Sequence, residues 1–517
     1  MEWLVRVARR AGLSPPAAVP RADPRPGAGR GHRPPAPLAV RVAARPLAGR
    51  PRAGRPRGFA AVMLAAALLA AGCGPAERAA DGDSDDSDDG RRHTARSRGE
   101  RPPAGKPSEH PRPGDLNGDG YDDFAAVVAG PSLVVVYGSA DGLDPRLRTV
   151  VPLPTSKRGP EQIQLFRADL DHDGYTDLVQ APQDRDPAVL WGGPRGVGDP
   201  QPLTGAPRSP AATGDFDGDG NADLFVPGGA TGPEGTVWYG PVERGGAPAR
   251  RQNLTGGRWP DSVPARFLTG DFDGDKATDL ALWFHWTDPD MEGDGDVVVS
   301  GLQYLRGGPQ GLRLTERREP PDIGLEGQPG DVDGDGIDDL FTAGFSAPRK
   351  QLAVGYRLST RSGPESGKQD GVLTGSPPGL TDATQYGGMG GTALGDVTGD
   401  GRADLVTSAT GANDNNGVVW LVPDLLAADA EAVQAVNLDS PGVPGSDTPA
   451  TGRGPTRNRI TVVGPLLDTD GDKHVDVVFG APGFLDAKKQ DLDAFWVLRG
   501  TDGGMKYHRH FTTEDLG

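Results

Sequence analysis

The sequence predicts an all-β chain that is built from seven repeated units. Three observations indicate this: 79 Gly and 51 Pro among 517 residues, a hydrophobic content of only 35%, and one short acidic motif that occurs seven times. Abundant Gly and Pro disfavour long helices and favour many short strands joined by turns. Regular repetition of a motif is typical of arrays in which each repeat is one supersecondary unit.

The acidic motif has the form D-x-D/N-x-D-G-x-x-D, and an apolar strand nearly always follows it. Side-chain oxygens recur at its first, third, fifth and ninth positions, and we take these residues as candidate metal ligands. They are Asp115, Asn117, Asp119 and Asp123; Asp169, Asp171, Asp173 and Asp177; Asp215, Asp217, Asp219 and Asp223; Asp271, Asp273, Asp275 and Asp279; Asp331, Asp333, Asp335 and Asp339; Asp396, Thr398, Asp400 and Asp404; and Asp468, Asp470, Asp472 and Asp476.

The spacing of these oxygens predicts up to seven calcium sites. Calcium prefers six to eight oxygen ligands at about 2.3 to 2.6 Å, which alternating acidic side chains of one loop can supply. Gly at the sixth position permits a sharp turn with positive φ that returns the last Asp towards the metal. No copy has Glu at the twelfth position, so the loops are not EF-hands. Asp-Gly clusters also form simple turns, but seven copies with four shared positions favour calcium.

Three copies depart from the ideal motif. Thr398 replaces an acid in the sixth copy, and Lys276 and Lys473 replace the turning Gly in the fourth and seventh copies. A neutral hydroxyl contributes no charge, and a side chain at positive φ is disfavoured. We expect these three loops to bind calcium most weakly and one or two of them to stay empty.

A second signature recurs within the units. An apolar-aromatic strand ends in a Gly turn, as in VVVYGSADGL from residue 134 and FWVLRGTDGGM from residue 495. Successive acidic motifs begin 46 to 72 residues apart, which leaves room for about four short strands in each unit.

Two segments, Gly391–Val422 and Leu466–Leu498, resemble the FG-GAP, or VCBS, repeats of the integrin α-subunit N-terminal domain. Residues 479–482, FGAP, match the motif for which that family is named. The resemblance spans about residues 114–517, and it implies a seven-bladed β-propeller with calcium-binding loops on one rim. Seven units fit the usual range of about four to eight blades. No strand is evident before the first motif, so we expect the C-terminal segment from Met505 to complete the ring.

The N-terminal part predicts export and lipid anchoring. Residues 1–50 are rich in Arg and Pro and receive no fold; they are either a long signal region or sequence upstream of the true start. Residues 51–72 have the charged-then-apolar order of a signal peptide, and the apolar run is too short to span a bilayer. The end of that run, LAAGC, resembles a bacterial lipobox, which implies that Cys73 is lipidated; ordinary cleavage with an incidental cysteine is the alternative. Residues 73–113 are polar and are expected to be a disordered tether.

Charge excludes one class of partner. Residues 1–60 carry 13 Arg and two acids, a net of +11, so the remainder carries −29 of the total of −18. A body this acidic repels phosphate, so nucleic acid is not an expected partner, whereas cations are. Cys73 is the only cysteine, so no intramolecular disulfide can stabilise the chain.

These features predict a calcium-binding lipoprotein on the extracellular face of the bacterial cell membrane, which acts in adhesion or binds a glycan, a cell-wall polymer or a protein. The long segments Ser359–Gly391 and Pro423–Ile460 are candidate binding loops, although each is equally well a plain surface loop. A secreted carbohydrate-active enzyme on a propeller scaffold and a structural envelope component are the alternatives.

One patch favours the enzyme. In residues 280–296 the aromatic side chains of Trp283 and Trp286 and the ring of His285 precede an acidic stretch, which suits sugar stacking or glycosidase chemistry. A core strand is the simpler interpretation. The sequence has neither zinc-protease His spacing nor a G-x-S-x-G elbow, so we assign no catalytic residue and expect no enzyme.

Overall fold

The computed structural model describes residues 99–128, 132–153, 163–182, 185–206, 208–228, 234–255, 266–287, 298–318, 327–346, 351–364, 389–426, 432–445, 459–485 and 491–517. All of them belong to one of two compact units, Ala65–Gly517. The expected extension (1–50), signal peptide (51–72), lipidation site Cys73 and first part of the tether lie outside the described residues. No helix in the described ranges is long and apolar enough to cross a membrane.

The described residues form antiparallel sheets with very little helix. Five sheets have four strands: β4 (Ile163–Ala168), β5 (Asp177–Pro182), β6 (Ala188–Leu190) and β7 (Gln201–Pro202); β8 (Ala212–Gly214), β9 (Asp223–Pro227), β10 (Gly235–Val242) and β11 (Pro248–Leu254); β12 (Arg266–Gly270), β13 (Asp279–Thr287), β14 (Val298–Arg306) and β15 (Arg313–Arg318); β21 (Met389–Gly395), β22 (Asp404–Ala409), β23 (Val418–Val422) and β24 (Gln434–Val436); and β25 (Thr461–Val462), β26 (Val477–Leu485), β27 (Asp491–Arg499) and β28 (Lys506–Thr512).

Two further sheets have three strands: β1 (Phe124–Val128), β2 (Ser132–Val136) and β3 (Arg148–Pro152); and β16 (Gly327–Gly330), β17 (Asp339–Ser346) and β18 (Gln351–Arg357). The strands β19 (Ser359–Thr360) and β20 (Gly363–Pro364) form a small hairpin, and the short helices are α2 (Ala412–Asn415) and α3 (Thr513–Leu516).

This arrangement is a β-propeller, but its blade count corrects the sequence expectation. Six blades are detected in the described residues, rather than seven, although seven sheets of three or four strands are present. The units that begin at Asp115 and Asp331 have fewer than four strands in one sheet. In the first unit the residues before Asp115 are rich in Pro, which has no N–H to donate to a strand ladder. That segment therefore supplies no inner strand.

Neighbouring sheets pack face to face through alternating residues of the strand that follows each acidic loop. Leu178 of β5 packs with the preceding sheet, beside Leu133 and Val135, whereas the next residue, Val179, packs with the following sheet, beside Leu224. Successive strand residues point to opposite faces, so a sheet that is covered on both faces needs a continuous apolar strand. This explains why the sequence pattern after each loop is an apolar run.

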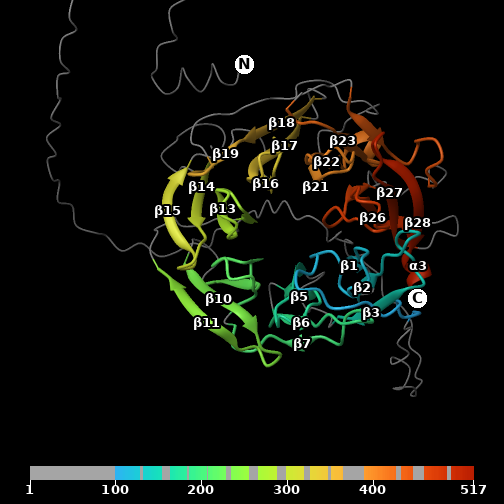
Figure 1. The fold of residues 1–517 in the computed structure, drawn as a ribbon. Helices are drawn as coiled ribbons and strands as arrows, with labels where there is room; N and C mark the ends of the chain where they lie inside the picture. Colours follow the sequence, from blue (N-terminus) through green and yellow to red (C-terminus); the bar gives the residue numbers. More distant parts are fainter. Residues whose placement is uncertain are drawn as a thin grey trace, which may run out of the picture. The chain divides into compact units, whose positions relative to one another are not determined.

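The first and last sheets meet in the same way. Phe124 of β1 packs against Phe495 of β27 with ring centroids 5.4 Å apart. The loops also meet: the Asp122 N–H donates to the Asp468 carbonyl at 2.9 Å, and the Asp468 N–H donates to Oδ2 of Asp122 at 3.0 Å. In Figure 1 the C-terminal strands lie beside β1–β3. The C-terminal segment from Met505 forms β28, the outer strand of the last sheet, where it pairs with β27.

Residues 99–113, the last part of the expected tether, lie along the acidic loops. The Lys106 N–H donates to the Gly118 carbonyl at 2.8 Å, and the Ser108 N–H donates to the Gly174 carbonyl at 2.9 Å. Arg112 contacts Asp122 and Asp468, each at 3.3 Å. This segment is held by loops of the first, second and last units, so a tether can extend only up to residue 98.

Candidate metal centres

Each acidic loop turns at two residues with left-handed backbone. The sixth position has positive φ in all seven loops, including Lys276 at 74° and Lys473 at 78°. The fourth position does too, with His172 at 59°. The positive φ predicted for the sixth position is therefore confirmed, and both lysines adopt it despite the steric cost.

The first-position Asp shapes this turn. In the first loop the Gly118 N–H donates to Oδ1 of Asp115 at 2.7 Å and the Gly120 N–H donates to its Oδ2 at 2.8 Å. The bond from the sixth-position N–H to Oδ2 recurs in five further loops, at 2.8 to 3.0 Å. The loop backbone thus folds around its own carboxylate, as in an Asx turn.

The ninth-position Asp has a structural role that the sequence analysis missed. Asp177 is fully buried; its Oδ2 accepts the Leu170 N–H at 2.8 Å and its Oδ1 accepts the Gly192 N–H at 2.7 Å. Equivalent pairs of bonds hold five more ninth-position residues: Asp123, Asp223, Asp279, Asp339 and Asp476. Each carboxylate joins its loop to the turn after the second strand that follows the loop, which explains why the second signature accompanies the first.

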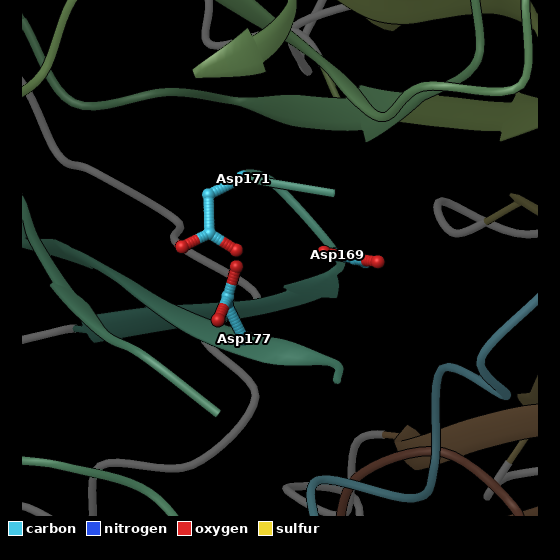
Figure 2. A group of neighbouring side chains, drawn as sticks. All are labelled: Asp169, Asp171 and Asp177. Carbon is cyan, nitrogen blue, oxygen red and sulfur yellow. The ribbon is translucent and has the colours of Figure 1, made fainter. Parts of the chain in front are cut away.

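Five loops bring three carboxylates together, with one oxygen from each within 4.8 Å of the others. Figure 2 shows the second loop, where Asp169, Asp171 and Asp177 form such a group. The other groups are Asp215, Asp217 and Asp223; Asp271, Asp273 and Asp279; Asp331, Asp333 and Asp339; and Asp468, Asp470 and Asp472. Oxygens that share one calcium at about 2.4 Å lie within about 4.8 Å of one another, so these groups fit calcium.

The third-position Asp provides a second test of whether these groups fit a cation. In Asp171, Asp217 and Asp273 one oxygen, Oδ1, is buried and has no hydrogen-bond partner among the described residues. The side chain of Asp273 is fully buried. A buried carboxylate oxygen without a partner is costly, and a cation in the group would satisfy it.

Burial also changes the acidity of the ninth-position carboxyls. It raises the pKa of Asp177 and of Asp223 to about 8, and the pKa of Asp279 to about 7, although backbone N–H donors act in the opposite direction. The same cause raises the pKa of Asp339 and Asp476 to about 7. Without a cation these groups keep their protons to a higher pH than an ordinary carboxyl, whereas a cation would favour the ionised form.

Thirteen of the predicted ligands lie outside the five groups. The fifth-position residues Asp173, Asp219, Asp275 and Asp335, and the ninth-position Asp476, are not members. The first loop (Asp115, Asn117, Asp119 and Asp123) and the sixth loop (Asp396, Thr398, Asp400 and Asp404) form no such group. Fifth-position oxygens instead accept the N–H two residues later, as Asp173 does from Tyr175 at 3.1 Å.

The two neutral third-position residues use their polar atoms locally. Asn117 donates its side-chain amide to Oδ2 of Asp119 at 2.9 Å. In the sixth loop the Thr398 N–H donates to Oδ2 of Asp404 at 2.8 Å. Both lysine loops gather three carboxylates and the Thr398 loop does not, so these three loops differ in arrangement. Their weak calcium binding stays a prediction.

Four arginines that the sequence analysis did not single out pair with third-position carboxylates. Arg306 stands at the end of β14 and Arg499 at the end of β27, each directly before the Gly of the second signature. That shared position could have identified these two arginines from the sequence. Arg244 and Arg250 occupy other positions in their units, which do not recur, so the sequence gives no such indication for them.

The proposed aromatic patch lies mostly outside the described side chains. Residues 280–287 belong to β13, and Leu282 is buried in the core between neighbouring sheets. The side chains of Trp283, His285 and Trp286 are not described. Most of residues 359–391 and part of residues 423–460 are also outside the described ranges.

Two segments match known repeat families. Residues 169–226 match the FG-GAP-like repeat, and residues 390–422 match the FG-GAP repeat. These segments contain the second and third acidic loops and the sixth loop, respectively. Together with the strand arrangement they support an FG-GAP repeat β-propeller.

Comparison with curated proteins gives no match. Among solved structures, a triple arginine-to-alanine mutant of AofleA from Arthrobotrys oligospora has 9% identity and a TM-score of 0.33, over 73% of this chain and 96% of that one. The exotype rhamnogalacturonan lyase YesX has 15% identity and a TM-score of 0.29, over 80% and 75%. Rhamnogalacturonan lyase YesW has 12% identity and a TM-score of 0.27, over 78% and 76%. TM-scores this low carry no functional argument.

Proposed function

We propose that the chain is a calcium-binding surface protein whose propeller serves as a ligand-binding or adhesion module. The observation that carries this proposal is the set of five carboxylate groups, three of which contain a buried oxygen without a partner. Calcium is the expected ion because hard carboxylate oxygens are its preferred ligands. The strongly acidic body adds a general attraction for cations.

Calcium binding is tested by equilibrium dialysis of the mature protein. We expect several ions per chain. We expect fewer for the double variant Asp217→Asn with Asp273→Asn, which removes one carboxylate from each of two groups. Asp439→Asn is the matched control, because Asp439 is exposed and belongs to no group. A protein that binds no calcium at millimolar concentration contradicts the proposal.

The ligand is proposed to be a glycan, a cell-wall polymer or a protein. Glycan-array binding with calcium, and again with excess chelator, tests this. Binding that requires calcium supports the module, whereas turnover of a bound sugar supports a carbohydrate-active enzyme. Absence of both leaves the structural envelope component as the remaining proposal.

Anchoring through lipidated Cys73 at the extracellular membrane face completes the proposal. It rests on the lipobox-like sequence and the apolar run before it. Cys73→Ser should move the protein from the membrane fraction into the medium. A variant that stays in the membrane fraction contradicts lipid anchoring and leaves the calcium proposal untouched.

A further inference from the structure

In four of the acidic loops a guanidinium group pairs with the third-position Asp. Arg250 Nη2 lies 2.5 Å from Oδ2 of Asp217, and Arg306 Nε lies 2.5 Å from Oδ2 of Asp273. The other two pairs are Arg499 with Asp470, at 2.9 Å, and Arg244 with Asp171. In every pair the arginine contacts Oδ2, so the third-position carboxylate is held in the same way in all four loops.

These arginines reach their carboxylates from three different places in the repeat. Arg306 and Arg499 end the third strand of their own sheet. Arg250 comes from the outer strand β11 and lies over the Tyr239 ring, 3.5 Å from its centroid. Arg244 follows β10 of the next sheet and lies over the Trp191 ring at 5.3 Å. Cationic side chains thus reach the same carboxylate oxygen from three places in the repeat.

On the two loops with a neutral third position, the nearby arginine pairs with other carboxylates. Where the third position is Asn117, the nearby Arg112 pairs with Asp122 and Asp468. Where it is Thr398, the nearby Arg402 pairs with Asp400 and Asp424. In the fifth unit the side chains of β18 lie outside the described residues.

In three of the four pairs, those of Asp171, Asp217 and Asp273, the arginine occupies Oδ2 and leaves Oδ1 without a partner among the described residues. Oδ1 of Asp273 is buried without a partner, while Oδ2 is taken by Arg306 and by the Tyr304 hydroxyl at 3.1 Å. The Asp273 side chain is fully buried, whereas that of Arg306 is 39% exposed. A guanidinium group and a metal ion can therefore act on the same carboxylate from opposite sides.

We propose that Arg244, Arg250, Arg306 and Arg499 are resident counter-ions, which stabilise their loops without calcium and weaken calcium binding at those loops. The inference rests on the proposed calcium function. A guanidinium group is attracted more strongly to three carboxylates than to the same carboxylates with a divalent cation among them. Because coupling is reciprocal, an arginine that favours the metal-free loop must lower the affinity for calcium.

The test is Arg306→Gln in the mature protein, with Arg313→Gln as the control, because Arg313 is exposed on β15 and pairs with no acidic loop. In excess chelator we expect a lower Tm for Arg306→Gln than for the control. In excess calcium that difference should shrink. Calorimetric titration should show one site with roughly tenfold higher affinity at low ionic strength, and a smaller gain at high salt.

Two further variants keep the result interpretable. Arg306→Lys retains the charge and should restore most of the chelated Tm. In an Asp273→Asn background Arg306→Gln should cost less, since the cycle isolates the pair.

A chelated Tm that is equal in Arg306→Gln and the control overturns the inference. So does a lower calcium affinity in Arg306→Gln, because the arginine would then position the ligand. A wild-type protein that binds no calcium refutes the proposed function instead, and the chelated comparison still decides whether the arginine is a counter-ion.

Discussion

The fourth and sixth loops depart from the repeat in opposite ways. The fourth has Lys276 at a position that requires positive φ, yet Asp271, Asp273 and Asp279 still gather into one group. The sixth keeps both turning glycines but has Thr398 at the third position, and no group forms there. The difference teaches that the third-position Asp supplies one of the three carboxylates in all five groups, whereas Lys at the sixth position does not prevent a group from forming.

The largest expected effect concerns pH and involves many loops at once. In chelated protein, stability should fall as pH rises from about 4 to 8. The raised pKa values, about 7 for Asp279 and about 8 for Asp177, mean that the folded state holds protons which the unfolded state has lost. Melting temperatures across this range, with chelator and with calcium, check this. Calcium favours the ionised carboxyls and should flatten the profile; identical profiles contradict the expectation.

Substitution of the ninth-position Asp should strongly destabilise the protein in both the fourth and the sixth loop. Asp279→Ala leaves the Phe272 and Gly307 N–H groups without their carboxylate partner, and Asp404→Ala does the same to Val397 and Thr398. We expect a loss of about 3 kcal/mol in each, because every unsatisfied buried N–H costs about 1 to 3 kcal/mol. Urea denaturation in chelator measures it, with Asp439→Ala as the control. A marked difference between the two loops would show that this role is not shared.

Exchange of the third-position residue should reverse the difference in calcium-dependent stability between the fourth and sixth loops. Asp273→Asn should remove about 1.4 kcal/mol of calcium-dependent stability, which is the contribution of one site at ten times its Kd. Thr398→Asp should add a contribution of that kind to the sixth loop. The measurement is the stability gained on adding calcium to chelated protein. A gain that Thr398→Asp leaves unchanged would mean that another feature disables the sixth loop.

The smallest expected effect tests the cost of the backbone turn at the sixth position separately from the ligands. Lys276→Gly should stabilise the protein by about 1 kcal/mol, and Gly401→Lys should destabilise it by about as much, because a side chain at positive φ costs about 1 to 2 kcal/mol. A Cβ at Gly401 would meet no atom within 4 Å, so the φ of 86° is the only obstacle. Denaturant unfolding in chelator measures both. Unequal calcium affinities in these variants would show that the sixth position affects the ligands as well.

Much of the fold could be predicted from the sequence because the repeated pattern marks each structural element. The acidic loop, the apolar strand after it and the Gly turn recur at regular intervals, and each corresponds to a described element. No strand was evident before the first motif, and the first sheet has no inner strand there. What that segment contacts could not be predicted, because its bonds to Gly118 and Gly174 join residues from different units.

The candidate site was predicted by residue type better than by role. The carboxylates at the first and third positions gather as expected in five loops. The ninth-position Asp was predicted only as a ligand. Its bond to an N–H group beyond the loop, such as that of Gly192 in the turn after β6, joins residues 15 positions apart and cannot be predicted from the motif. Arg306 and Arg499 could have been found from their shared position before the Gly turn, whereas Arg244 and Arg250 occupy no repeated position.

The measurement that tests the account most directly is the Tm of the mature protein before and after verified metal removal. Five calcium sites at about 1.4 kcal/mol each would contribute about 7 kcal/mol, comparable with the whole stability of a typical domain. With no disulfide to replace that contribution, chelation should lower the Tm by many degrees, and calcium should restore it. An unchanged melting curve after complete metal removal would show that the acidic loops are turns, and would contradict the calcium account.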